Sequence, residues 1–124
     1  MVFCVALFAC TTTPEDKAQD IPVIHIVLVW LNDSDNEEHL QQVIDTSNQL
    51  KEIPVVQELR VGKSISSDRK IVDDSFDVGI YMKFHSASDM EDYLVHEKHK
   101  QAVKTVLKPL ANKILVYDIS LPIN

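Results

Sequence analysis

The segment that most constrains the fold is residues 23–31, VIHIVLVWL, because it predicts a β-strand that is apolar on both sides. Alternate side chains of a strand point to opposite faces of a sheet. One face carries large apolar residues (Ile24, Ile26, Leu28, Trp30), and the other carries Val27, Val29 and Leu31 together with His25. Both faces of any sheet that contains this strand must therefore be covered.

The middle of the chain predicts one helix and two further strands. Ser34 and Glu37 have the spacing of a capping box, and apolar residues recur at helical spacing from there until Pro54. Residues 55–63 predict a short strand. Residues 76–84 alternate between apolar and other residues, which is the clearest strand pattern in the chain. The long polar connection over residues 64–75 indicates a mobile flap or a partner contact.

The last third predicts a second helix and a final strand. Ser86 or Ser88 can cap the helix, and its apolar face is interrupted over residues 96–99, so we expect a broken or kinked helix there. Residues 114–121 predict the closing strand.

The order β-α-β-β-α-β is that of the ferredoxin-like unit, an α+β fold with a four-stranded antiparallel sheet and two helices on one face. We expect this domain to span residues 23–121. Two helices on one face leave the other face bare, and the simplest cover is the same face of a second copy. The sequence thus predicts a homodimer.

Composition excludes several functions. Twelve Lys and Arg against 19 Asp and Glu give a net charge of −7, which disfavours nucleic acid as a partner. Gly62 and Gly79 are the only glycines, too few for a glycine-rich phosphate loop. Both cysteines, Cys4 and Cys10, lie in the first ten residues, so the rest of the chain has no disulfide or thiolate metal site. We expect neither a cofactor nor a metal.

The N-terminal segment, residues 1–22, resembles a bacterial lipoprotein signal followed by a polar tether. Its apolar run, residues 2–9, is much shorter than the roughly 20 residues of a membrane-spanning helix. The run ends at Ala9 and Cys10, and in a lipoprotein signal such a cysteine accepts the lipid before cleavage. This interpretation places the protein in the bacterial cell envelope, facing the periplasm or exterior. The alternative is a frayed N-terminus with an incidental cysteine on a cytoplasmic protein.

Several segments together resemble the stress-responsive dimeric α/β-barrel (Dabb) family. The resemblance covers about 100 residues and is carried by HIVLVWLND, FDVGIYMKF, DYLVHEKHKQAV and LKPLANKILVYDIS, which begin at His25, Phe76, Asp92 and Leu107. It implies protomers that pair into a barrel whose interior holds a small apolar molecule. Many members have no assigned reaction, whereas a plant branch cyclises polyketides without metal or cofactor.

The resemblance to that branch implies a site. Its acid/base histidine corresponds to His99 and its tyrosine to Tyr93, while His25, and with it His96, is expected to line the pocket. A histidine titrating near pH 6.5 suits proton removal next to a carbonyl, and a tyrosine hydroxyl can polarise the enolate. The alternative is that these are ordinary core or rim residues. His96 and His99 have metal-ligand spacing, but no nearby carboxylate or cysteine completes a site.

Two functions follow from these observations. The first is a stress-linked module that binds a small apolar or anionic molecule without turnover. The second is a cofactor-free lyase or cyclase with His99 as acid/base. The second helix region is basic because it contains five lysines (Lys98, Lys100, Lys104, Lys108, Lys113). This basic surface is either simply solvated or holds an anionic ligand or lipid headgroups.

The lipoprotein interpretation predicts a specific mass. Protein extracted with detergent should begin at Cys10 and carry the added mass of the lipid groups, because cleavage precedes the modified cysteine. Mass spectrometry of the intact chain checks this, and an unmodified N-terminal Met would contradict it.

Overall fold

The structure, a computed structural model, describes residues 20–122, so Cys10 and most of the expected signal and tether lie outside it. The chain forms a four-stranded antiparallel sheet in the order β2-β3-β1-β4. Its elements are β1 (Val23–Leu31), α1 (Glu37–Gln49), η1 (Leu50–Glu52), β2 (Glu58–Lys63), β3 (Val78–Phe84), α2 (Ala87–Val95), α3 (Glu97–Ala102), η2 (Val103–Leu107), α4 (Lys108–Leu110) and β4 (Ala111–Ser120). The predicted ferredoxin-like order is confirmed. Within the described residues, no helix has the length and apolar character to cross a membrane.

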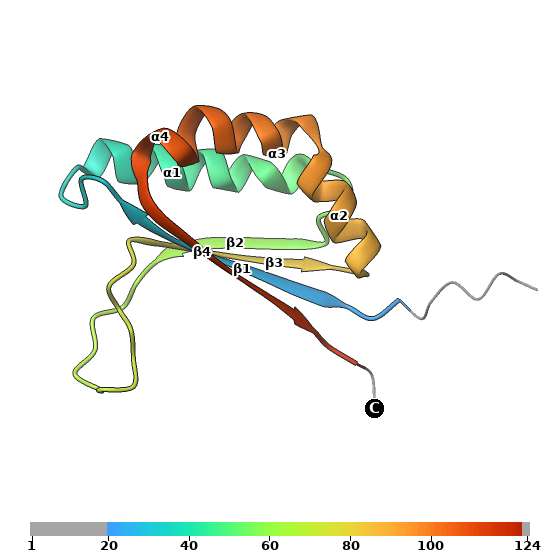
Figure 1. The fold of residues 1–124 in the computed structure, drawn as a ribbon, viewed down its shortest axis with the longest axis horizontal. Coiled ribbons are helices and arrows are strands. Elements are labelled where there is room, and N and C mark those ends of the chain that lie inside the picture. The colour runs from blue at the N-terminus through green and yellow to red at the C-terminus, as the bar shows by residue number, and fades with distance from the viewer. Residues whose placement is uncertain (1–19, 123–124) are drawn as a thin grey trace, which may run out of the picture.

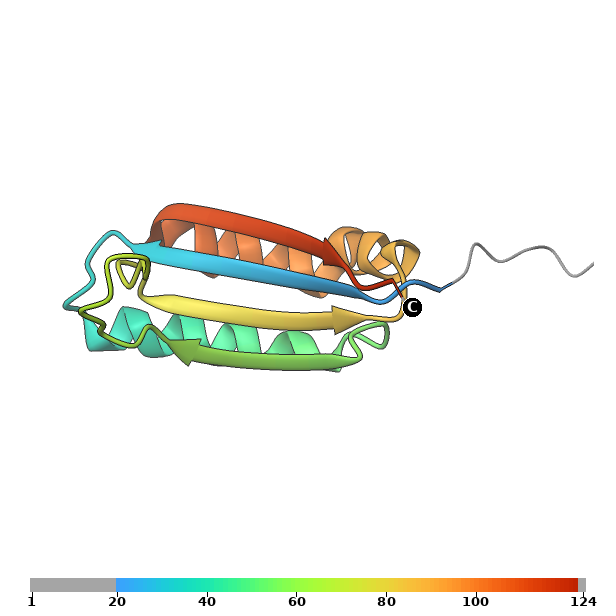
Figure 2. The ribbon, with the colours of Figure 1, turned by 90° about the horizontal axis from the view of Figure 1, so that it is seen from below.

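All the helices lie on one face of the sheet (Figure 1). Figure 2, seen from the other side, shows α1 behind β2 and β3, and the helices from α2 to α4 behind β1 and β4. The sheet face opposite the helices, which we call the open face, has no helix of residues 20–122 over it. This is the architecture expected from the sequence.

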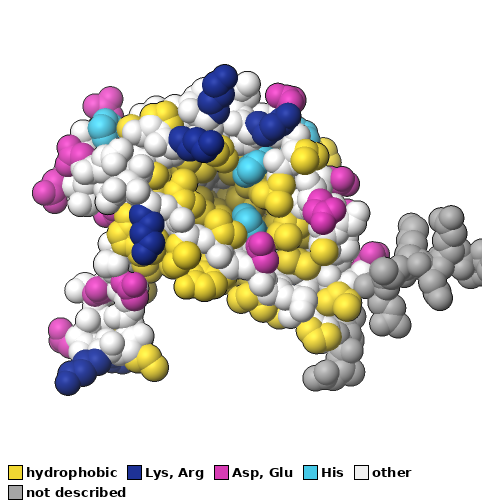
Figure 3. All heavy atoms as spheres, viewed as in Figure 1, with side chains coloured by type: hydrophobic (Ala, Val, Ile, Leu, Met, Phe, Trp, Pro, Cys, Tyr) yellow, Lys and Arg dark blue, Asp and Glu magenta, His cyan; other side chains and the backbone are white. Residues whose placement is uncertain are grey.

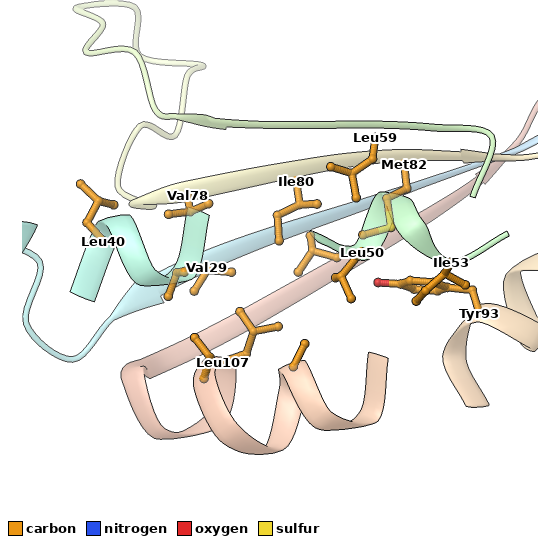
Figure 4. Close-up of a cluster of buried hydrophobic side chains, with 14 of the residues drawn as sticks. Val29, Leu40, Leu50, Ile53, Leu59, Val78, Ile80, Met82, Tyr93 and Leu107 are labelled. Carbon is orange, nitrogen blue, oxygen red and sulfur yellow. The ribbon is translucent and has the colours of Figure 1, made fainter. Parts of the chain in front are cut away.

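The core lies between the sheet and the helices (Figure 4). In β1 the side chains on the helix side, from Val23 to Leu31 at alternate positions, are buried. They meet buried residues of the other strands and of α1 (Leu59, Val78, Ile80, Met82, Phe84, Leu40, Val43). Full burial of such a side chain contributes about 1.5–3 kcal/mol, so this layer is the main source of stability.

Several boundaries differ from the predicted ones. Asn36, not Ser34, caps α1: its side chain accepts from the backbone N–H of His39 at 3.0 Å, and Ser34 lies inside a turn closed by Asp33 and Asn36. The strand β4 starts three residues earlier than predicted, at Ala111, because it pairs along the whole of β1. The strands β2 and β3 begin at Glu58 and Val78, slightly later than predicted.

The break in the second helix is confirmed and lies at His96. This residue has an extended backbone, with φ −67° and ψ 139°, and separates α2 from α3. Its Nδ1 accepts from the backbone N–H of Lys98 at 3.1 Å, so His96 caps α3. The π-helical turn η2 that follows was not predicted.

The N-cap of α2 provides a matched test of the fold. The Ser86 hydroxyl accepts from the backbone N–H of Asp89 at 3.1 Å, whereas Ser88, the other predicted cap, lies exposed within the first turn. Ser86→Ala should lower the free energy of unfolding by about 1 kcal/mol, and Ser88→Ala should leave it nearly unchanged. Urea unfolding at one fixed protein concentration measures both, and equal losses would contradict this assignment of the cap.

Candidate functional site

Four aromatic side chains meet where β1, β3, α2 and α3 come together. His25 lies on the helix side of β1, Phe84 ends β3, Tyr93 lies in the last turn of α2, and His99 lies in α3. The ring centroids of Tyr93 and His99 are 4.6 Å apart, and those of His25 and Tyr93 are 5.9 Å apart. Phe84 lies 5.2 Å from the Tyr93 ring and closes the cluster on the side of β3. The structure thus brings together three of the residues expected to form the site.

The helix break at His96 positions His99. In an unbroken helix, two residues six positions apart are separated by about 9 Å along the axis. The extended backbone at His96 changes the direction of the chain between α2 and α3, and the two rings pack against each other. His96 itself serves as the cap of α3, and no described contact joins its imidazole to the cluster.

A carboxylate holds the imidazole of His25. The His25 side chain is 5% exposed, and its Nδ1 donates to Asp118 Oδ1 at 2.5 Å. The β1–β4 register places these residues directly opposite each other. Because the carboxylate can only accept, the Nδ1 atom carries a proton and Nε2 is the remaining ring nitrogen. Sequence reasoning missed Asp118; the only indication was one acid within an otherwise apolar strand pattern.

His99 presents a basic nitrogen. Its Nδ1 donates to the carbonyl oxygen of Leu94 at 2.9 Å, so in the neutral ring Nε2 carries a free lone pair. Burial lowers the pKa of His99 below its usual value, and the nearby His25 adds to this effect, while the Leu94 carbonyl opposes it. His99 is therefore neutral at pH 7 and able to accept a proton.

Tyr93 supplies a hydroxyl that stays protonated. The residue is 1% exposed, and burial raises the pKa of its hydroxyl well above the usual value near 10. Figure 4 shows the phenol projecting from α2 into the interior between the sheet and the helices. At physiological pH it can donate a hydrogen bond but cannot act as a base.

A hollow with apolar walls opens between the helices and β4. Ile114 and Val116 pair with Val29 and Val27 and so face the helices, yet they remain 38% and 45% exposed. Figure 3 shows this hollow, with hydrophobic side chains around it and histidine at its edge. Asp118 lies on the same side of β4, half-exposed. Apolar walls with a few converging polar groups are typical of small-molecule sites.

The model of the stress-responsive A/B barrel domain family, Dabb, matches residues 23–121. The chain belongs to this family. The match confirms the family resemblance predicted from the sequence, and it covers all four strands and all the helices. No curated protein matches the chain.

Solved structures share the Dabb fold with this chain. Hydroxynitrile lyase from Passiflora edulis is 21% identical, with a TM-score of 0.72 and coverage of 85% of this chain and 97% of that one. A Dabb protein from Mesorhizobium loti is 22% identical, with a TM-score of 0.68 and coverage of 84% and 99%. A dimeric protein of unknown function from Bacteroides fragilis is 22% identical, with a TM-score of 0.66 and coverage of 81% and 96%. These likenesses establish the fold.

The described residues of this Dabb domain contain no cluster of three or more His, Cys, Asp or Glu side chains that could hold a metal ion. The lysines of α3 have carboxylate neighbours: Lys98 Nζ lies 2.5 Å from Glu52 Oε2, and Lys100 Nζ lies 2.7 Å from Glu97 Oε1. The first of these ion pairs joins α3 to η1 at the end of α1. It therefore helps to fix the position of the element that carries His99.

The lowered pKa of His99 makes a prediction about pH. Because the folded protein binds the proton less tightly than the unfolded chain, this residue stabilises the fold above the unfolded pKa near 6.5, and the contribution is lost as pH falls below it. The Cε1 proton of His99 should titrate by NMR with a midpoint below 6.5. Stability of wild type should fall more steeply than that of His99→Gln between pH 6.5 and 5, and a midpoint at or above 6.5 would contradict this prediction.

Proposed function

We propose that this protein is a homodimeric Dabb barrel that binds a small molecule in the hollow beside Tyr93, His99 and His25. The observation that carries the proposal is the meeting of a protonated hydroxyl group, a neutral imidazole and a carboxylate-held imidazole in one cluster. It is supported by the apolar hollow that has histidine at its edge. The apolar walls suit a hydrocarbon group, and the polar groups suit a carbonyl or carboxylate. The ligand class is therefore a small apolar or anionic carbonyl compound.

The open face of the sheet supports the homodimer. The register places Ile26 beside Tyr117 and Leu28 beside Leu115 on this face, and Tyr117 and Ile119 are exposed. An apolar face of this extent is typically covered by another surface. The relative from Bacteroides fragilis is a dimeric protein.

A cofactor-free lyase or cyclase is the second candidate, favoured by the packing of the His99 ring, whose Nδ1 is held by Leu94, against the ring of Tyr93, with centroids 4.6 Å apart. In the lyase reaction, His99 takes the hydroxyl proton of a hydroxynitrile. The carbonyl then forms as the bond between the hydroxyl-bearing carbon and the nitrile carbon breaks. Cyanide leaves with the electron pair and takes the proton back from the imidazolium. In the cyclase reaction, the same imidazole nitrogen removes a proton next to a carbonyl, and the enolate carbon forms a bond to a second carbonyl carbon of the molecule. The alkoxide that results takes the proton back from the imidazolium. Tyr93 would donate to the carbonyl oxygen in both reactions.

The proposal includes a lipid anchor at Cys10 that tethers the domain to a bacterial membrane. It is supported by the apolar run ending in Ala9 and Cys10 and by the polar residues that follow. Residues 11–22 would then link the anchor to β1, which starts at Val23.

Benzaldehyde and benzoate are suitable probes of the site, because both combine an apolar ring with a carbonyl or carboxylate. Either should shift the NMR signals of His25 and His99 and leave that of His39, on α1, unchanged. His99→Ala and Tyr93→Phe should each weaken binding about tenfold, as expected for the loss of one buried hydrogen bond. His39→Ala is the matched control, and unchanged binding by both site variants would contradict the proposed pocket.

Turnover separates the two candidates. With mandelonitrile as substrate, release of benzaldehyde above the uncatalysed background would favour the lyase. The rate should then rise with pH through a midpoint below 6.5 and fall by about 10²–10⁴ in His99→Ala. Binding of the probes without turnover of this compound favours the binding module.

A further inference from the structure

The connection between β2 and β3, residues 64–77, forms an arm that leaves the body of the domain. Figure 1 shows it extending from the sheet to the side opposite the helices, and Figure 2, seen from that side, shows it at one end of the open face. Any molecule that covers the open face therefore lies beside the arm.

Two large apolar side chains on the arm are exposed. Ile65 is 83% exposed and Ile71 is 92% exposed, the highest values among the exposed large hydrophobic residues of the described chain. Figure 3 shows hydrophobic atoms at the end of the arm next to Lys and Arg side chains. Single exposed apolar residues are common, but here two lie on one projecting segment that buries neither.

The arm has a defined internal structure. The backbone N–H of Ser67 donates to Asp74 Oδ2 at 2.8 Å, which joins the outgoing and returning halves of the arm. A turn at its end is closed by the N–H of Val72 and the carbonyl of Arg69 at 3.0 Å. These bonds hold the two isoleucines on an ordered segment, so a partner that meets them does not need to order the arm first.

The base of the arm is continuous with the open face. Trp30 lies on this face, its indole N–H donates to Ser75 Oγ at 2.9 Å, and its ring packs against Phe76 at 6.3 Å. Asp77 fixes the end of the arm, because its carboxylate accepts from the backbone N–H of Leu31 at 2.7 Å. A surface that packs on Trp30 therefore runs directly onto the arm.

We propose that the arm contacts the second subunit of the dimer and that Ile65 and Ile71 become buried against it. This inference rests on the proposed homodimer. In that dimer the second subunit packs on the open face, and the base of the arm is part of that face. Two-fold symmetry makes the contact twice, so each substitution in the arm removes two contacts from the dimer.

The test compares the dimer dissociation constants of full-length variants by analytical ultracentrifugation. Ile65→Ser combined with Ile71→Ser should raise the constant by about tenfold or more, because burial of four isoleucine side chains is lost. Val95→Ser is the matched control: Val95 is also apolar and 67% exposed, but it lies on α2, on the helix side of the sheet. It should leave the constant unchanged.

The outcomes separate the arm from the dimer. A dimeric wild type whose constant is unchanged in the double variant overturns the proposal for the arm and leaves the homodimer standing. A wild type that stays monomeric at all concentrations overturns both proposals.

A labelling experiment does not depend on the folding of the double variant. Ile71→Cys should react with a maleimide about tenfold more slowly above the dimer dissociation constant than below it, with the label located by peptide mass. Val95→Cys should react at one rate at both concentrations. Equal rates for Ile71→Cys at both concentrations would overturn the proposal.

Discussion

The central strand β1 is the element on which the rest of the structure depends. It pairs with β3 on one side and β4 on the other, and it is apolar on both faces. Its helix-side residues form the centre of the core, and its other residues form the centre of the open face. One nine-residue segment thus requires both the helical layer within the chain and a second surface outside it.

The candidate site occupies the place where that apolar pattern is interrupted. His25 is the one polar side chain of β1 on the helix side, and it is tolerated there because Asp118 accepts its Nδ1 proton. The break at His96 then brings His99 onto Tyr93. The Nδ1 atom of His99 donates to the Leu94 carbonyl in α2, so the position of the other ring nitrogen, Nε2, depends on the same break. The chemistry of the site therefore follows from one polar residue in an apolar strand and one break in a helix.

Local patterns predicted the fold well because they depend on neighbouring residues. The two faces of β1, the alternation from Val78 to Phe84 and the break near His96 are all properties of short segments. The β4 boundary was missed because its pairing depends on the whole length of β1. At the start of α1, both Ser34 and Asn36 are good caps, and the turn closed by Asp33 decided between them.

The site was predicted only in part, because its contacts join distant segments. The sequence and the family resemblance indicated His25, Tyr93 and His99, and the structure brings their rings together. The role of Asp118 depends on the β1–β4 register across 93 positions of sequence, which no local pattern encodes. His96 was expected beside the pocket because it lies between Tyr93 and His99 in the sequence. In the structure its Nδ1 instead accepts from the backbone N–H of Lys98 and caps α3.

The strand β4 links the open face to the hollow. Its side chains alternate, so Leu115, Tyr117 and Ile119 lie on the open face while Val116 and Asp118 line the side of the helices. Because β4 is an edge strand that pairs, among the described strands, only with β1, a surface that packs on the open face restrains the backbone that carries Asp118. Asp118 in turn fixes the protonated nitrogen of His25. A surface that packs on the open face thus helps to hold Asp118 and His25 in position on the helix side of the sheet.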